Sequence, residues 1–295
     1  MVKRIKGEKI KLEGFNNLTK SLSFNIYDLC YARSIESQIE YLEYVDEEYN
    51  SSRLEEIVSE VTRIINAKLV QVSTQDYDPR GASVVALLNE DQPLSEEHPP
   101  AVKINTRNSD LTPNVGTLSG QAVLSAECLL EHQPLVVGHL DKSHIAIHTY
   151  PEYNQLSGIA SFRVDVDIAT CGMISPLSAL RYLIGSFDSE VVLVDYRVRG
   201  FTRDHLGRKF FIDHDIASIQ DYIDDEVLEH YIAYDVNIVS DNNFHTKMRK
   251  KDIKLVDFLF GHDVHDLETD EKKQIKSALE LEIQEIFECK NIGGR

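Results

Sequence analysis

Residues 158–170 read Gly-Ile-Ala-Ser-Phe-Arg-Val-Asp-Val-Asp-Ile-Ala-Thr, and this run decides how the middle of the chain folds. Apolar side chains recur at every second position from Phe162 to Ile168, with charged side chains between them. A period of two is typical of a strand with one apolar face and one polar face. If the strand stays regular to its end, the same parity places Cys171 on the polar face.

A second strand is predicted over residues 135–149, joined to the first by a turn at residues 153–158. Outward from this hairpin, further strands are predicted at residues 10–32, 68–75, 82–88, 191–199 and 234–239, with 208–212 pairing onto 191–199. Helices are predicted at residues 34–48, 52–67 (capped by Ser51 or Ser52), 175–187, 215–230 and 270–289. This pattern predicts an α+β fold, a two-layer α/β sandwich with a mostly antiparallel sheet, rather than a parallel Rossmann sheet.

Composition narrows the class of protein. Acidic residues outnumber basic ones by 49 to 31, for a formal charge of −18, so a nucleic-acid partner is not expected. The chain shows no secretory signal and no apolar stretch of membrane-spanning length, and its four cysteines are widely spaced. We therefore expect a cytoplasmic protein without a membrane partner, folded as a single domain over residues 1–295.

Ser143 is the residue of greatest chemical interest, because His144 and His148 lie within five positions of it. A serine in a strand is usually structural, but histidine is well suited to proton transfer near neutral pH. Ser143 and His148 differ by five positions, so a straight strand would point them to opposite faces. A shared site requires a bend, a bulge or a break in the chain between them.

Six segments, in this order along the chain, resemble the longer bacterial branch of the S-adenosylmethionine decarboxylases. They are residues 14–24 (Gly-Phe-Asn-Asn-Leu-Thr-Lys-Ser-Leu-Ser-Phe), 140–144 (Leu-Asp-Lys-Ser-His), 148–152 (His-Thr-Tyr-Pro-Glu), 170–172 (Thr-Cys-Gly), 195–204 (Asp-Tyr-Arg-Val-Arg-Gly-Phe-Thr-Arg-Asp) and 244–248 (Phe-His-Thr-Lys-Met). The resemblance thus spans most of the chain. Residues 101–127 look like additional sequence relative to a compact family member, within a Pro-rich stretch at 89–130 read mostly as a loop.

The resemblance implies that the chain cuts itself between Lys142 and Ser143 into a β chain, 1–142, and an α chain, 143–295. Ser143 would attack the carbonyl of Lys142 to form an ester, with His148 as the proton acceptor in processing. Elimination, tautomerisation and loss of ammonia would then convert Ser143 to a pyruvoyl group. Such a carbonyl can form a Schiff base with the amine of an amino acid and accept electrons during decarboxylation.

The same resemblance assigns Cys171 as the proton donor in catalysis, and Glu152 and Phe15 as substrate-binding residues. Phe15 could stack on an adenine or a sulfonium group. The implied reaction is the decarboxylation of S-adenosylmethionine to S-adenosylmethioninamine, the aminopropyl donor for spermidine biosynthesis, in an assembly of several two-chain protomers.

Two alternatives stay open. One is a pyruvoyl-dependent decarboxylase of another amino acid, such as ornithine or arginine, and the other is a homologue that no longer processes itself and serves only in binding or regulation. Magnesium is expected as an activator, without assigned residues. The crowded Asp204, His205, Asp213, His214 and Asp215 could suggest a metal site, but a structural role is as well supported, so we assign no metal ligands.

Overall fold

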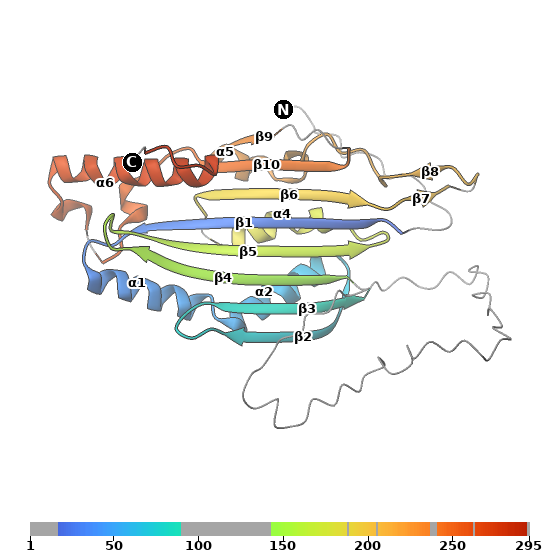
Figure 1. The fold of residues 1–295 in the computed structure, drawn as a ribbon, viewed down its shortest axis with the longest axis horizontal. Helices are drawn as coiled ribbons and strands as arrows, with labels where there is room; N and C mark the ends of the chain where they lie inside the picture. Colours follow the sequence, from blue (N-terminus) through green and yellow to red (C-terminus); the bar gives the residue numbers. More distant parts are fainter. Residues whose placement is uncertain are drawn as a thin grey trace, which may run out of the picture. The chain divides into compact units, whose positions relative to one another are not determined.

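The computed structural model describes residues 17–89, 143–187, 189–204, 206–236, 241–261 and 263–293, and these residues belong to one compact unit. Their main feature is an eight-stranded sheet with the strand order β2-β3-β4-β5-β1-β6-β10-β9 (Figure 1). Neighbouring strands of this sheet are paired antiparallel throughout. The predicted α+β fold with a mostly antiparallel sheet is therefore confirmed.

In chain order, the strands of this sheet are β1 (Thr19–Tyr31), β2 (Lys68–Asp76), β3 (Ala82–Asn89), β4 (His144–Asn154), β5 (Ile159–Cys171), β6 (Val191–Arg199), β9 (Tyr231–Asp235) and β10 (Asn243–Lys250). The long strands β1 and β5 lie at its centre and pair over thirteen residues, from Thr19 with Cys171 to Tyr31 with Ile159. Their pairing makes the central register unambiguous, because a slip of one residue would turn the apolar side chains to the wrong face.

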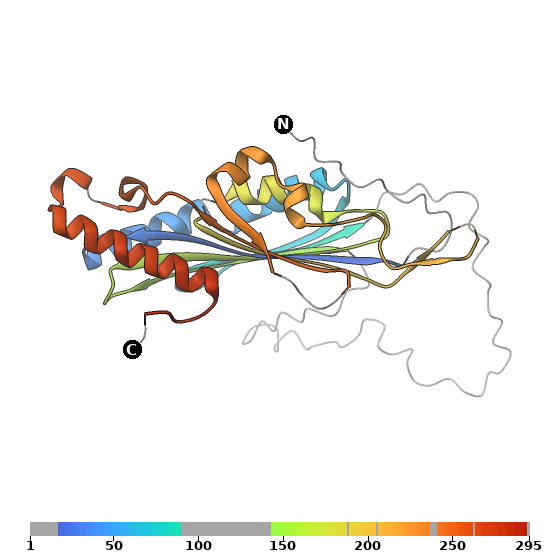
Figure 2. The ribbon, with the colours of Figure 1, turned by 90° about the horizontal axis from the view of Figure 1, so that it is seen from above.

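The apolar face of the sheet is covered by three helices, α1 (Ile35–Glu48), α2 (Ser51–Ile64) and α4 (Leu180–Ser186), which lie together on one side in Figure 2. In α2 the apolar residues recur at helical spacing, and Leu54, Ile57, Val58 and Val61 are all fully buried. Asn50 caps this helix by accepting a hydrogen bond from the Arg53 N–H at 3.0 Å. The predicted cap at Ser51 or Ser52 is wrong, since the Ser51 hydroxyl donates to Asp76 instead.

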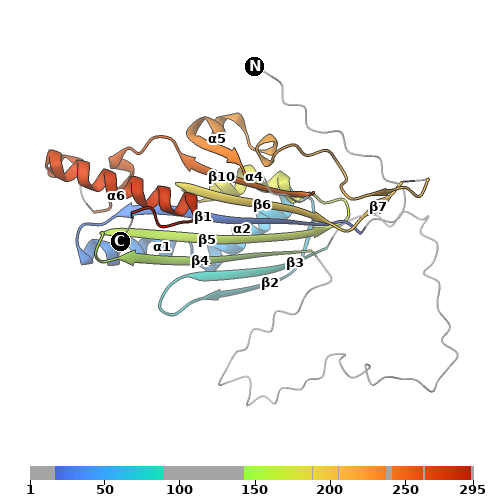
Figure 3. The same cartoon turned by 45° about the horizontal axis from the view of Figure 1, so that its top comes forward.

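A longer helix, α6 (Thr269–Glu288), packs on the opposite face at one end of the sheet (Figure 3). Its side chains Leu279 and Ile283 belong to a second apolar cluster with Leu29, Val191 and Leu193, which have the opposite strand parity to the main core. The predicted helix at 270–289 is confirmed, and it adds a third layer at this end. Beyond α6, this face carries the polar residues Ser23, Asn25, Asp165 and Asp167 of β1 and β5.

The region after β6 differs most from the sequence prediction. The helix predicted at 215–230 is wrong: a 3₁₀ turn, η2 (Ile219–Tyr222), and a short helix, α5 (Asp225–His230), occupy it instead. Ile223 between them is extended, with φ −101° and ψ 136°, so one continuous helix cannot form. The strand predicted at 234–239 begins earlier, at Tyr231.

The predicted pairing of residues 208–212 with 191–199 is also wrong. There, β8 (Lys209–Phe210) pairs with β7 (Thr202–Arg203) in a separate two-stranded sheet. The helix predicted at 175–187 is confirmed as two segments, a 3₁₀ turn η1 (Pro176–Ala179) followed by α4. Two more 3₁₀ turns, η3 (Leu255–Phe258) and η4 (Val264–Asp266), precede α6.

Among the helices in the described part of the chain, we find none with the length and apolar character that a membrane span requires. The additional sequence at 101–127 lies outside the described residues. So does the first part of the strand predicted at 135–149, of which residues 144–149 belong to β4.

Candidate active site

Ser143 lies immediately before β4, at the end of the sheet where β1 begins and β5 ends. Its side chain is buried. The hydroxyl oxygen accepts a hydrogen bond from the backbone N–H of Cys171 at 3.1 Å, and its carbonyl accepts one from Leu88 N–H at 2.7 Å. The serine is therefore held between β3 and β5.

Cys171 is the last residue of β5 and is exposed. Its placement follows from the alternation of β5, in which Val164, Val166 and Ile168 are buried toward the helices. The prediction that Cys171 belongs to the polar face is therefore confirmed. The pairing of β4 with β5, in which His144 faces Ala169, brings Ser143 beside Cys171 although the two are far apart in sequence.

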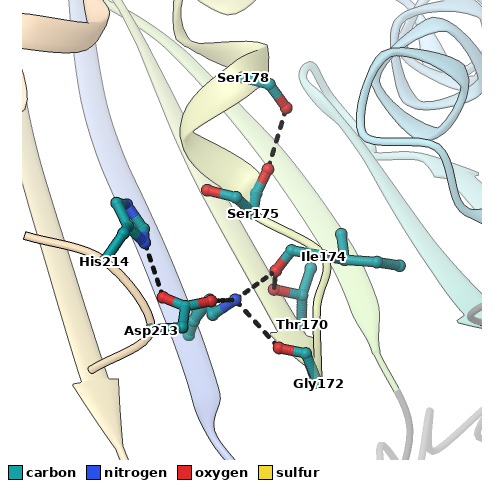
Figure 4. Close-up of polar contacts among 8 residues, drawn as sticks. Thr170, Gly172, Ile174, Ser175, Ser178, Asp213 and His214 are labelled. Atoms are coloured by element: carbon teal, nitrogen blue, oxygen red, sulfur yellow. Dashed lines mark hydrogen bonds and ion pairs between the residues drawn. The ribbon is translucent and has the colours of Figure 1, made fainter. Parts of the chain in front are cut away.

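The turn that follows Cys171 is closed by a buried ammonium group (Figure 4). Lys20, on β1, has no solvent exposure. Its Nζ donates to the carbonyls of Gly172 at 3.0 Å and Ile174 at 3.1 Å, and to a carboxylate oxygen of Asp213. His214 Nδ1 contacts the other carboxylate oxygen of Asp213 at 2.7 Å. We refer to Lys20, Asp213 and His214 as the lysine cluster.

The lysine cluster keeps its carboxylate ionised. Burial would raise the pKa of Asp213, but the hydrogen bond with His214 and the charge of Lys20 outweigh burial and lower that pKa to about 2. A lysine ammonium has three protons to donate, and the structure gives Lys20 three acceptors. A lysine is rarely buried this completely unless it is paired in this way.

His148 lies on β4, four residues beyond His144, where it faces Asp165 of β5. At a strand rise of about 3.3 Å per residue, this places it roughly 13 Å along the strand from His144. Its Nδ1 is 2.9 Å from the hydroxyl of Tyr77, which lies between β2 and β3. Within one chain, the structure therefore keeps His148 away from Ser143. This agrees with their parity, which points the two side chains to opposite faces of a straight strand.

Glu152 lies farther still along β4 and accepts a hydrogen bond from the Ser161 hydroxyl at 2.7 Å. The pKa of Glu282 on α6 is raised by burial and by the charges of Glu285 and Glu152, so Glu152 lies near this helix. Glu152 is thus placed toward the α6 end of the polar face, away from Ser143. Phe15 and Lys142 lie outside the described residues.

The acidic residues near position 210 are engaged in other contacts. Asp204 accepts hydrogen bonds from the N–H groups of Leu206 and Arg208, both at 2.9 Å, and pairs with the Arg208 guanidinium. Asp213 belongs to the lysine cluster, and His205 lies outside the described residues. Within the described ranges, no group of three or more His, Cys, Asp or Glu side chains is arranged to hold a metal ion.

Two contributors to this site were not assigned a role from sequence. Lys20 does carry a signal, because it shares strand parity with Leu22, Phe24 and Ile26, so a charged residue interrupts an apolar face. The partnership with Asp213 has no local signal, since the two residues are 193 positions apart. Tyr77 likewise meets His148 only through the pairing of β3 with β4.

The chain is similar to known families and proteins. Residues 117–200 match the family model described as S-adenosylmethionine decarboxylase. Curated relatives named S-adenosylmethionine decarboxylase proenzyme occur in Clostridium perfringens strain SM101 (52% identical, covering 97% of this chain and 98% of the relative) and Heliobacterium modesticaldum (50% identical, 99% and 98%). One from Clostridium botulinum strain Eklund 17B is 49% identical and covers 96% of this chain and 97% of the relative.

Proposed function

The chain belongs to the S-adenosylmethionine decarboxylase family, and from this premise we propose that it decarboxylates S-adenosylmethionine. The product would be S-adenosylmethioninamine, the aminopropyl donor for spermidine biosynthesis. The structural observation that supports this proposal is the contact between Ser143 and Cys171, the two residues to which the family resemblance assigns the central chemistry.

The proposal includes a maturation step carried out by the chain itself. The Ser143 oxygen would attack the carbonyl of Lys142, which breaks the peptide C–N bond and leaves an ester and a free amine on residue 143. Loss of the Cα proton would then break the bond between Cβ and the ester oxygen. The serine oxygen stays on the new carboxylate of chain 1–142, and residue 143 is left as dehydroalanine. An acyl shift needs a serine held firmly in place, because an ordinary peptide bond is stable. The hydrogen bond from Cys171 N–H and the burial of Ser143 support such a restraint.

Tautomerisation to an imine and its hydrolysis by water, with release of ammonia, would convert residue 143 of the second chain to a pyruvoyl group. This group supplies a carbonyl that accepts electrons during decarboxylation. The surroundings fit this group. The position is buried, and Cys171 lies directly beside it. The thiol of Cys171 would return a proton to the substrate after CO₂ leaves.

Substrate binding and assembly belong to the same proposal. Glu152 and Phe15 would bind the substrate, whose sulfonium and ribose suit a carboxylate and whose adenine suits an aromatic ring. Within one chain, His148 and Glu152 lie on β4 at a distance from Ser143. We propose that several two-chain protomers assemble, so that β4 of a neighbouring protomer supplies these residues. A cytoplasmic location and activation by magnesium stay predictions.

The maturation is tested by the intact mass of freshly purified protein under denaturing conditions. We expect two chains divided between Lys142 and Ser143, the second lighter by one ammonia than a chain that begins with serine. A single full-length mass that persists in all buffers would contradict the maturation. Carbon dioxide released from ornithine or arginine but not from S-adenosylmethionine would contradict the substrate.

The assembly is tested by co-expressing two variants, Ser143→Ala and His148→Ala. If His148 acts on Ser143 of a neighbouring protomer, His148→Ala alone should stay uncut, and its Ser143 should be cleaved when the Ser143→Ala partner supplies an intact His148. If His148→Ala stays uncut in the mixture as well, then His148 does not act between protomers.

A further inference from the structure

The lysine cluster lies at the active-site end of β1, and its contacts form a continuous chain to Ser143. Lys20 binds the carbonyls of Gly172 and Ile174, which are the residues on either side of Met173 in the turn after β5. The residue before Gly172 is Cys171, and its N–H binds the Ser143 hydroxyl. The hydrogen bonds at both ends of this chain join buried or partly buried groups, and the peptide bond between Cys171 and Gly172 connects them.

The turn itself is shaped for this contact. Gly172 has φ +63°, a left-handed conformation that glycine adopts without strain. The Gly172 N–H donates to Leu18 O at 3.1 Å, and the Thr170 hydroxyl donates to Ile174 O at 3.1 Å. The carbonyls of Gly172 and Ile174 are therefore turned inward, where a lone ammonium group can bind both.

Burying the ammonium group of Lys20 and the carboxylate of Asp213 costs solvation free energy, so a role beyond stability is indicated. An ammonium group and a carboxylate lose much of their hydration when they are buried, and a pair of apolar side chains would often stabilise a fold equally well. A charged donor, however, binds carbonyl oxygens more strongly than a neutral donor does. It therefore suits a turn that must hold its shape beside a reacting group.

We propose that Lys20 is a positioning residue for both steps of the proposed function. Its ammonium group, held in place by Asp213, restrains the turn at 171–174. This restraint keeps Cys171 beside Ser143. In maturation, the restrained turn presents the Cys171 N–H to the Ser143 oxygen. In catalysis, it presents the Cys171 thiol. This inference rests on the proposed function, because it assigns Lys20 a part in that chemistry.

The test compares three variants with the wild-type protein. Lys20→Met removes the ammonium group and keeps an unbranched side chain of similar length. The double variant Lys20→Met/Asp213→Asn also neutralises the carboxylate, so that no uncompensated charge is left buried. Lys250→Met is the matched control, because the Lys250 ammonium contacts the buried Glu190 carboxyl group at 2.8 Å at the other end of the sheet.

The primary measurement is the rate at which the full-length chain is converted to two chains, followed by denaturing electrophoresis. Thermal unfolding is measured in parallel. For Lys20→Met we expect cleavage to slow by about 10- to 100-fold, in line with the loss of charged hydrogen bonds. In the double variant, thermal stability should recover in part while cleavage stays slow. Lys250→Met should lose stability and still cleave at the wild-type rate.

Turnover provides a second readout that a purely structural role would not change in the same way. In the cleaved fraction of Lys20→Met, kcat should fall while KM for S-adenosylmethionine stays close to that of the wild type, because the thiol is misplaced but the substrate still binds. Cleavage of Lys20→Met at the wild-type rate would overturn the inference, as would a double variant whose cleavage recovers together with its stability. Failure of the wild-type protein itself to cleave would instead overturn the proposed function.

Discussion

The two ends of β1 carry buried charges that are balanced in different ways. Near its beginning, Asp213 is buried with two basic neighbours, Lys20 and His214. Near its end, two carboxylates, Asp28 and Glu190, lie close together, and Lys250 pairs with Glu190. Both groups of residues contact β1, but only the first contacts the turn that holds Cys171.

The difference appears in the pKa values. The pKa of Asp213 is lowered to about 2, whereas burial and the charge of Asp28 raise the pKa of Glu190 to about 8 despite Lys250. Burial disfavours both carboxylates, so the outcome depends on which charges surround each one. The end of β1 at the candidate active site therefore keeps an ion pair near neutral pH, while the far end holds a carboxyl group that can carry a proton.

The largest effect is expected from Ser143→Ala. Without the hydroxyl, no acyl shift can take place, so the chain should stay whole and show no decarboxylation. Ser189→Ala is a suitable control, because Ser189 is equally buried but lies beside Glu190 at the far end. It should cleave normally. Intact mass and CO₂ release distinguish the outcomes, and a Ser143→Ala chain that still divides after residue 142 would contradict the assignment of Ser143.

The next effect is expected from Cys171→Ala. Its backbone N–H remains, so the chain should still cut itself, but turnover should fall by roughly 10²- to 10⁴-fold because the proton donor is lost. Cys289→Ala, at the other exposed cysteine of the described residues, should have near wild-type activity. Cleavage and CO₂ release are measured on the same samples. Full activity in Cys171→Ala would show that another group donates the proton.

The strands at the active-site end could be predicted from sequence because their signals are local. The alternation of Val164, Val166 and Ile168 defines β5, and its parity places Cys171 correctly. The segment at 215–230 misled the prediction, because its apolar residues have helical spacing while Ser218 begins a separate 3₁₀ turn. The spacing of apolar residues does not show where a capping side chain, such as Ser218, starts a new turn.

The contacts that organise the site could not be predicted in the same way. Ser143 meets Cys171, and Lys20 meets Asp213, only after the strands pair and the segment after β8 folds over β1. A sequence pattern nominates candidate residues such as Ser143 and Cys171, but it does not show which distant carboxylate neutralises a buried lysine. The parity conflict between Ser143 and His148 was visible in the sequence, and the structure retains it.

The contrast in pKa predicts a pH effect on stability at the far end. Below the unfolded pKa of about 4.3, Glu190 is protonated in both states and its contribution is present in full. That contribution is lost as the pH rises from about 4.3 to the folded pKa of about 8, because over this range the unfolded chain has released the proton that the folded protein still holds. Relative to Glu190→Gln, the parent should therefore lose on the order of 3 kcal/mol of unfolding free energy between pH 5 and pH 8.

Urea unfolding in the uncut Ser143→Ala background measures this effect on a single chain. Asp213→Asn is measured in the same background as a control at the other end of β1. Because the pKa of Asp213 is about 2, its contribution is lost only at pH values below this window, and the difference between parent and variant should not change from pH 5 to pH 8. Parallel pH profiles for Glu190→Gln and its parent would show that the two ends of β1 are not electrostatically different.

The smallest effect is expected midway between the two ends, at Tyr77. Its hydroxyl contacts His148 Nδ1 at 2.9 Å and so orients the ring and leaves Nε2 as the nitrogen available for proton transfer. Loss of this hydrogen bond in Tyr77→Phe should cost about 1 kcal/mol and slow cleavage by roughly fivefold if His148 accepts the proton in processing. Tyr150→Phe is the control, because it keeps the ring that stacks against His148. Equal cleavage rates in both variants would mean that the orientation of His148 does not limit processing, and would confine the processing machinery to the Ser143 end of the sheet.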